Sequence, residues 1–254
     1  MRWLLVLAAI IGAECLVARA AAQTIIDPEA TAAMRHHMQS HHGGMTAWKI
    51  FGERLEYQSN DGDPALVFEG EALWGGDRNK LWLKTEGEYE FNGSEFEQAE
   101  LQVLYSRAVR AFWDIQTGVR RDFANGVNRT WGVFGIKGLA PYLFETDAAI
   151  FVSGHGEATA RIEAEYELLF TQRLILQPRV ELNLSAQDIP ELEIGSGLTS
   201  AELGARLRYE FSRQFAPYVG FEWRTAGSST ARIQRLNGTD PRAFSVLAGI
   251  RFWF

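Results

Sequence analysis

The sequence predicts an all-β fold, an antiparallel up-and-down barrel of about twelve strands, from three observations. First, apolar and polar residues alternate with a period of two along most of the chain after residue 46, as in half-buried strands. Second, the connections between these strands fall into two alternating sets, and one set contains all the long members. Third, the chain ends on Phe254, which completes an amphipathic strand.

The first element, residues 1–22, is predicted to be an export signal. Arg2 is followed by an apolar stretch over residues 3–12, and the small residues up to Ala22 fit a small-x-small cleavage site. We expect cleavage after Ala22. The alternative, a lipid anchor on Cys15, is disfavoured because Glu14 occupies a position that needs a small residue.

Residues 23–45 form a polar arm without strand periodicity, which we expect to be short and flexible, and residues 46–254 form the barrel. The final strand shows the alternation best, and the same pattern recurs over residues 158–168, 174–184 and 201–209. The apolar positions of the final strand are Phe244, Val246, Ala248, Ile250, Phe252 and Phe254.

One face of these strands is apolar and the other carries charges of both signs, which suits either a soluble β-sandwich or an outer-membrane barrel. The strands are close to the ~9–11 residues that cross a bilayer at a tilt, which favours the membrane. A terminal phenylalanine also resembles the C-terminal insertion signal of bacterial barrels. Aromatic residues near strand ends fit an interfacial girdle, namely Trp74, Tyr89, Tyr105, Trp113, Tyr142, Tyr209 and Trp223.

The connections give the strand count. One set is short, at residues 75–79, 107–111, 139–141, 171–173 and 212–214. The other set is at residues 58–64, 91–94, 122–128, 153–156, 185–200 and 225–243. Outer-membrane barrels have short periplasmic turns and longer outer loops, and an even strand number places both termini in the periplasm. Ten or fourteen strands remain open, because the strands around Trp48 and Trp131 alternate poorly.

Charged residues that share the inward parity of their strands are predicted to line the lumen. Basic residues facing lipid near the midplane would cost roughly 2–4 kcal/mol each, so this parity is strongly enforced. We expect most of these charges to be paired with one another. The predicted lumen residues are Glu86, Glu88, Asp114, Arg120, Glu145, Asp147, Glu163, Glu165, Glu181, Arg206, Arg208 and Glu222.

Metal-binding chemistry is concentrated in the arm. Apart from Met1, every methionine lies between residues 34 and 45, together with four of the five histidines. Thioether sulfur suits Cu(I), and imidazole suits Cu(II), Cu(I), nickel or zinc, so the mixture favours copper. Seven such ligands could hold roughly one or two ions. The predicted ligands are Met34, His36, His37, Met38, His41, His42 and Met45.

Two other interpretations of the arm are a solvated histidine-rich tail and a purification tag. Interspersed methionines behind a signal peptide argue against a tag. Helical spacing would bring Met34, His37, Met38, His41 and Met45 near one face. Met45 also lies close before the first strand at Trp48, and an extended residue spans at most ~3.3–3.6 Å, so the end of the arm cannot stray far from the barrel rim. The remaining histidine, His155, is predicted to be solvated in an outer loop.

Composition excludes several classes of function. The formal net charge of −7 argues against a nucleic-acid partner. The single cysteine excludes an intrachain disulfide framework and any multi-cysteine zinc or iron–sulfur site. A hydrolase needs a base beside a nucleophile, yet only His155 lies outside the arm and no G-x-S-x-G motif occurs, so we expect no enzyme activity.

Seven stretches of the barrel region resemble the copper resistance protein B family of bacterial outer-membrane proteins. The resemblance covers nearly all of residues 46–254, although the arm is shorter than in many members, which puts high-capacity sequestration in doubt. The matching stretches are residues 70–77, 80–88, 138–145, 169–178, 207–210, 215–220 and 251–254.

The resemblance implies a barrel for copper resistance and homeostasis that binds periplasmic copper or passes it outward. Its partners would be copper, as Cu(I) or Cu(II), outer-membrane lipid and periplasmic copper-handling proteins. The alternative is a passive pore or structural barrel with an incidental metal-binding arm.

Overall fold

The computed structural model describes residues 28–41, 46–60, 63–91, 95–124 and 127–254. The chain divides into two compact units, residues 1–45 and residues 46–254. The predicted signal peptide, residues 1–22, lies outside the described residues. Within the described ranges, no helix is long and apolar enough to cross a membrane.

In the first unit, the described part of the arm is one helix, α2 (Pro28–His41). Proline suits the first turn of a helix because its missing N–H needs no partner there, and Glu29 lies favourably near the positive end of the helix dipole. Alanines at positions 30, 32 and 33 have the highest helix propensity. The helical spacing considered for the arm is therefore present over Pro28–His41.

The second unit is a single sheet of strands joined mostly by tight turns. Its strands are β1 (Ala47–Asn60), β2 (Asp63–Gly75), β3 (Asn79–Glu90), β4 (Glu95–Arg110), β5 (Trp113–Ala124), β6 (Val127–Ala140), β7 (Phe144–Ser153), β8 (Ala158–Glu165), β9 (Leu168–Leu169), β10 (Leu174–Ser185), β11 (Gly197–Tyr209), β12 (Phe215–Ala226) and β13 (Arg242–Trp253).

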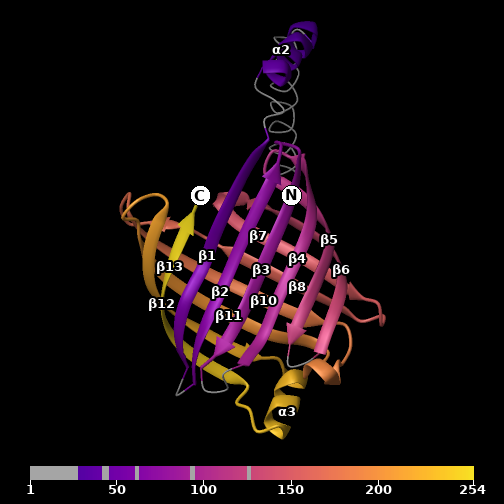
Figure 1. Cartoon of the computed structure of the whole chain (residues 1–254), viewed down its shortest axis with the longest axis vertical. Coiled ribbons are helices and arrows are strands. Elements are labelled where there is room, and N and C mark those ends of the chain that lie inside the picture. Colours follow the sequence, from indigo (N-terminus) through magenta and orange to yellow (C-terminus); the bar gives the residue numbers. More distant parts are fainter. Residues whose placement is uncertain (1–27, 42–45, 61–62, 92–94, 125–126) are drawn as a thin grey trace, which may run out of the picture. The chain divides into compact units, whose positions relative to one another are not determined.

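The sheet closes on itself (Figure 1). Neighbouring strands pair antiparallel in sequence order, and β13 pairs with β1. β8 and β9 both pair with β10 in one continuous register, so they are two parts of one interrupted strand. The described residues therefore form a closed antiparallel barrel of twelve strands, and the predicted fold class and strand count are confirmed.

The two strands that alternate poorly in the sequence have different explanations. In β1 a bulge between Gly52 and Arg54 inserts one residue against β2. Such a bulge exchanges the faces of the residues that follow it: Ile50 is exposed before it, whereas Leu55 is exposed after it. In β6 the inward residues Trp131 and Val133 are themselves apolar, so both faces of this strand are hydrophobic.

The connections divide between the two ends of the barrel. Five tight turns lie at one end, including η1 (Pro141–Leu143), and the chain's C-terminus lies at that same end. The two longest connections lie at the other end: residues 186–196 carry η2 (Pro190–Leu192), and residues 227–241 carry α3 (Ser228–Leu236) (Figure 1). The predicted difference in connection length between the two ends is therefore present, but it comes from these two connections. The connection predicted at residues 58–64 is shorter than expected, because β1 continues to Asn60 and β2 begins at Asp63.

Apolar side chains cover the outside of the barrel and charged ones fill the inside. On β13, Phe244 and Val246 are half exposed, whereas the intervening Ser245 is buried. An apolar outer band is stable in lipid, and inward charges avoid it. Five predicted girdle aromatics have exposed side chains: Trp74, Tyr105, Tyr142, Tyr209 and Trp223.

Candidate functional site

The predicted copper ligands lie in the first unit, and the structure describes some of them. Met34 is 66% exposed, and His36 and His37 are also exposed on α2. Met38 and His41 belong to the same helix, whereas His42 and Met45 lie outside the described residues. Positions 34, 37, 38 and 41 follow the i, i+3, i+4, i+7 spacing of one helix face. Within the described ranges, no group of three or more His, Cys, Asp or Glu side chains is arranged to hold a metal.

The barrel interior is a network of ion pairs, as predicted. Its most buried carboxylate is Glu56 on β1, with an exposed fraction of 0%. Arg206 on β11 donates to both oxygens of Glu56, at 3.0 and 2.8 Å, and to Glu222 at 2.8 Å. The Tyr218 hydroxyl donates to Glu56 at 3.0 Å. Burying charges inside a membrane barrel is tolerated because each is paired and hydrogen-bonded.

Some of these ion pairs cross the lumen. Arg161 on β8 donates to Glu86 on β3 at 2.9 Å and to Glu100 on β4 at 3.1 Å. At least three strands separate β8 from β3 and β4 around the barrel. The Arg161 side chain therefore spans the interior rather than bridging neighbouring strands.

Two lysines make a second crossing. Lys84 on β3 contacts Asp147 on β7 at 2.5 Å, and Lys137 on β6 contacts Glu71 on β2 at 2.7 Å. Weaker contacts of 3.8 and 3.9 Å join each lysine to the other carboxylate. Lys137 also lies 4.7 Å from the centre of the Trp82 ring, a favourable cation–π contact. Together these groups hold four strands in a fixed arrangement across the lumen.

A cavity of about 310 Å³ lies on the turn side of these crossings, and we call it the vestibule. It lies towards the end of the barrel that carries the C-terminus, because Phe51 and Arg251 line it near the outer ends of β1 and β13. Seven carboxylates and four basic groups line it, a formal excess of three negative charges. The carboxylates are Glu53, Glu69, Glu71, Glu145, Asp147, Glu163 and Glu165, and the basic groups are Arg54, Lys137, Arg206 and Arg251.

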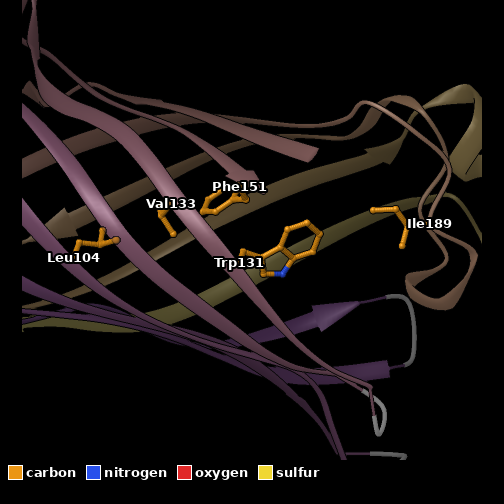
Figure 2. Packing of buried hydrophobic residues seen from close by; sticks show 5 residues of the cluster. All are labelled: Leu104, Trp131, Val133, Phe151 and Ile189. Carbon is orange, nitrogen blue, oxygen red and sulfur yellow. The ribbon is translucent and has the colours of Figure 1, made fainter. Parts of the chain in front are cut away.

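An apolar cluster lies among these charged groups. Leu104 on β4, Trp131 and Val133 on β6 and Phe151 on β7 point inward, and Ile189 from the long β10–β11 connection completes the cluster (Figure 2). Each of these side chains is at most 4% exposed. The lumen thus holds an acidic vestibule, ion pairs that cross it and an apolar cluster, and further ion pairs such as Arg120–Asp122 and Arg224–Glu88 lie towards the loop end.

All twelve charged residues predicted to face the lumen do so. Eleven are buried or half-buried, and Glu145, which is exposed, lines the vestibule. Most are ion-paired, such as Glu181 with Arg179 at 2.6 Å. The exposed loop histidine, His155, donates its backbone N–H to Ser153 and takes part in no described metal cluster.

Sequence reasoning did not identify two features of the interior. It did not predict that residues 186–196 place Ile189 inside the barrel mouth, and it did not single out Lys84 and Lys137. The apolar inward positions of β6 were a usable signal, since an apolar residue at a lumen position requires an apolar partner.

Comparisons with known proteins agree with this architecture. Residues 46–254 match the family model described as copper resistance protein B precursor. The chain belongs to the copper resistance protein B family.

Copper resistance protein B of Escherichia coli is 40% identical over 220 residues, which cover 86% of this chain and 74% of that protein. A homolog from Pseudomonas syringae pv. tomato is 39% identical over 216 residues, covering 85% of this chain and 72% of the homolog. Among solved structures, the NanC porin aligns with a TM-score of 0.54 and 14% identity, over 81% of this chain and 99% of the porin, a similarity of fold alone.

These findings support the outer membrane as the location of the barrel and a role in copper resistance. They also favour a non-enzymatic role, because the family is named for copper resistance.

Proposed function

We propose that this protein captures periplasmic copper on its N-terminal arm and passes it to, or holds it at, an outer-membrane barrel for copper resistance. One observation carries the proposal: three methionines and four histidines lie within twelve residues directly before a barrel of the copper resistance protein B family. Periplasmic copper-handling proteins would be the source of the metal.

The donor set supports copper over other metals. Thioethers are soft neutral ligands that favour Cu(I), and imidazoles accept Cu(II) as well as Cu(I), zinc and nickel. Four of the seven ligand positions, 34, 37, 38 and 41, share one face of α2 by helical spacing. A mixed set of this kind can hold copper in either oxidation state.

The vestibule supports passage of a cation through the barrel. Its excess of acidic groups raises the local concentration of cations in a low-dielectric channel. The alternative is a passive pore or a structural barrel with an incidental metal-binding arm. Ion pairs such as Arg161–Glu86 cross the lumen and disfavour an open pore, and the copper measurements below separate the proposal from a structural barrel.

The proposal is tested by separating the two kinds of ligand. Replacing Met34, Met38 and Met45 together by Leu should weaken Cu(I) binding at least about tenfold and leave most Cu(II) binding intact, because only the soft ligands are lost. Replacing His36, His37, His41 and His42 by Ala should do the reverse. Each set should lower the copper tolerance of expressing cells.

The matched control is His155→Ala, which removes a histidine from the β7–β8 connection, at the end of the barrel opposite the start of β1, and should change neither affinity. Binding is measured by competition with Cu(I) and Cu(II) chelators on the purified full barrel with its arm. If both sets of replacements leave affinities and tolerance unchanged, the arm is not the copper site.

A further inference from the structure

The connection between β10 and β11, residues 186–196, covers one mouth of the barrel, and we call it the cap segment. Its Ile189 side chain is 2% exposed and packs in the apolar cluster with Trp131 and Phe151 (Figure 2). Leu192 and Ile194 of the same segment pack against this cluster. The cap segment therefore contributes to the core of the barrel interior rather than extending into solvent.

The cap segment has its own internal structure. Ile189 and Ile194 form an antiparallel bridge with N–O distances of 2.7 and 3.1 Å, and η2 lies between them. The side chain of Asp188 accepts a hydrogen bond from the Ser196 backbone at 2.6 Å. These bonds join residues 188 and 189 to residues 194 and 196, so they hold the first half of the segment against the second.

Few bonds hold the first half of the cap segment to the barrel. Arg129 of β6, which is 5% exposed, pairs with Glu191 of the cap segment and also with Glu157 of the β7–β8 turn. The backbone N–H of Ala186 and the side chain of Gln187 donate to the β7–β8 side at 2.9 and 3.1 Å.

The second half is fastened to α3. The Gly195 backbone N–H donates to Thr230 Oγ1 at 3.0 Å, and Asn237 donates to Glu193 at 2.7 Å. A Cβ on Gly195 would lie only 2.5 Å from Ser229, so the segment is packed closely there. This half forms a fixed base, whereas the half that carries Ile189 is held by packing and by the Arg129 pairs.

Two cavities of the interior share part of their lining. A second, smaller cavity of about 40 Å³ reaches Leu104, Val133 and Phe151 of the apolar cluster. Four carboxylates line both this inner cavity and the vestibule: Glu69, Glu71, Asp147 and Glu163. Ile189 of the cap segment packs in the cluster to which Leu104, Val133 and Phe151 belong, so the segment covers these lining residues of the inner cavity at the loop end.

We propose that the cap segment is a gate: residues 186–192 swing out from the base fixed to α3. The Arg129–Glu191 ion pair, with Arg129 held in position by Glu157, and the Ile189–Ile194 bridge keep it closed. Opening would expose the apolar cluster and the inner cavity to the outer mouth. The proposal concerns access to the lumen and does not depend on copper binding by the arm.

The test measures access to a single cysteine beneath the cap segment. Ala149 lines the inner cavity and packs against the apolar cluster, and Cys15 is the only cysteine of the chain, so Ala149→Cys in a Cys15→Ser chain gives a unique thiol. The probe is a small cationic methanethiosulfonate reagent, applied to the purified barrel in micelles. Asp77→Cys, in an exposed turn at the opposite end, gives the rate for an open site.

We expect slow labelling of Ala149→Cys in the otherwise unchanged chain and a rate about ten times higher when Arg129→Gln is added, since a charge-assisted hydrogen bond is lost. Ile189→Ala should also accelerate labelling by weakening the packing. The matched control is Arg121→Gln, an outward-facing arginine of β5 bonded to Thr130, which should have no effect. Heat-modifiable migration confirms that each variant is a folded barrel.

Two results would overturn the proposal. If Ala149→Cys is labelled as fast as Asp77→Cys both with and without Arg129→Gln, the cap segment does not limit access to the inner cavity. Equal rates in the unchanged, Arg129→Gln and Ile189→Ala chains would show that the segment is a fixed plug.

Discussion

At the scale of single residues, the barrel interior is stabilised by ion pairs between buried charged side chains. Glu56 is fully buried and accepts hydrogen bonds from Arg206, Tyr218 and Gln58. A buried carboxylate that loses its cation retains its desolvation cost without compensation. Replacing only one partner of the pair therefore lowers the free energy of unfolding more than replacing both.

Replacing Arg206 by Leu should lower the free energy of unfolding by about 3–5 kcal/mol, because Glu56 and Glu222 lose a buried partner. Combining Arg206→Leu with Glu56→Leu should cost less than the sum of the single replacements, since both charges of the main pair are then gone. Urea unfolding in lipid vesicles measures both. Arg121→Leu, on the outer face, should change stability by less than about 0.5 kcal/mol. A purely additive double variant would argue against coupling through this pair.

At the scale of elements, the seam between β13 and β1 closes the barrel, and Phe254 lies directly at its end. The Ile50 backbone N–H donates to the Phe254 carbonyl at 3.0 Å, and the Phe254 N–H donates to Ile50 at 2.9 Å. The rings of Phe252 and Phe254 lie 5.9 Å apart on the outward face. The last residue thus contributes both to strand pairing and to the aromatic outer surface.

Deleting Phe254 should reduce the yield of heat-modifiable barrel in the outer membrane several-fold, because both hydrogen bonds of the closing seam and the terminal aromatic ring are lost. Phe211→Ala, which removes an exposed ring near another turn, is the control and should assemble normally. Normal assembly without Phe254 would contradict its role as an insertion signal.

The cap segment provides a pH-dependent element outside the membrane-spanning strands. Burial raises the pKa of Glu157, but a hydrogen bond from Ser153 and the Arg129 guanidinium, with a smaller effect of His155, lower it below its ordinary value overall. A lowered pKa means that the ionised carboxylate stabilises the closed segment above about pH 4.3, and this stabilisation is lost as pH falls through the lowered pKa. Asp188 has a lowered pKa as well, because the Ser196 N–H bonds to it.

We therefore expect the cap segment to stay immobile at pH 5–7 and to loosen in the acidic range, as pH falls through the lowered pKa of Glu157. A spin label on Pro190→Cys, an exposed position of the moving half, in the Cys15→Ser chain should show a broad spectrum above this range and a narrower one below it. Glu157→Gln should make the label more mobile even at pH 7, whereas Glu90→Gln, at the end of β3, should not. An unchanged spectrum down to pH 3 would show that these carboxylates do not hold the segment.

At the scale of the whole molecule, the barrel and the arm are separate compact units with different chemistry. The family match begins at residue 46, and pairing of β1 with β13 closes the barrel without any residue of the arm. Each unit can therefore be altered without removing the interactions that define the other.

Deleting residues 23–45 should leave barrel assembly and thermal stability unchanged and abolish high-affinity copper binding. Heat-modifiable migration measures the first property and chelator competition the second. Deleting the cap segment, residues 187–194, is the contrasting control, because it should destabilise the barrel and spare copper binding. Copper affinity that survives removal of the arm would move the site into the barrel.

The sequence by itself predicted the closed antiparallel barrel and the inward charges, because a membrane imposes a two-residue periodicity on most strands; its count of twelve strands left ten or fourteen open. The bulge at Gly52 and Arg54 was not readable, whereas the apolar inward positions around Trp131 were a signal whose packing partners only the structure shows. Only the tertiary structure decided which charges pair across the lumen and where the vestibule lies. It also decided that Ile189 enters the barrel mouth. All these contacts join residues far apart in the chain, and their positions along the barrel axis depend on strand tilt and register.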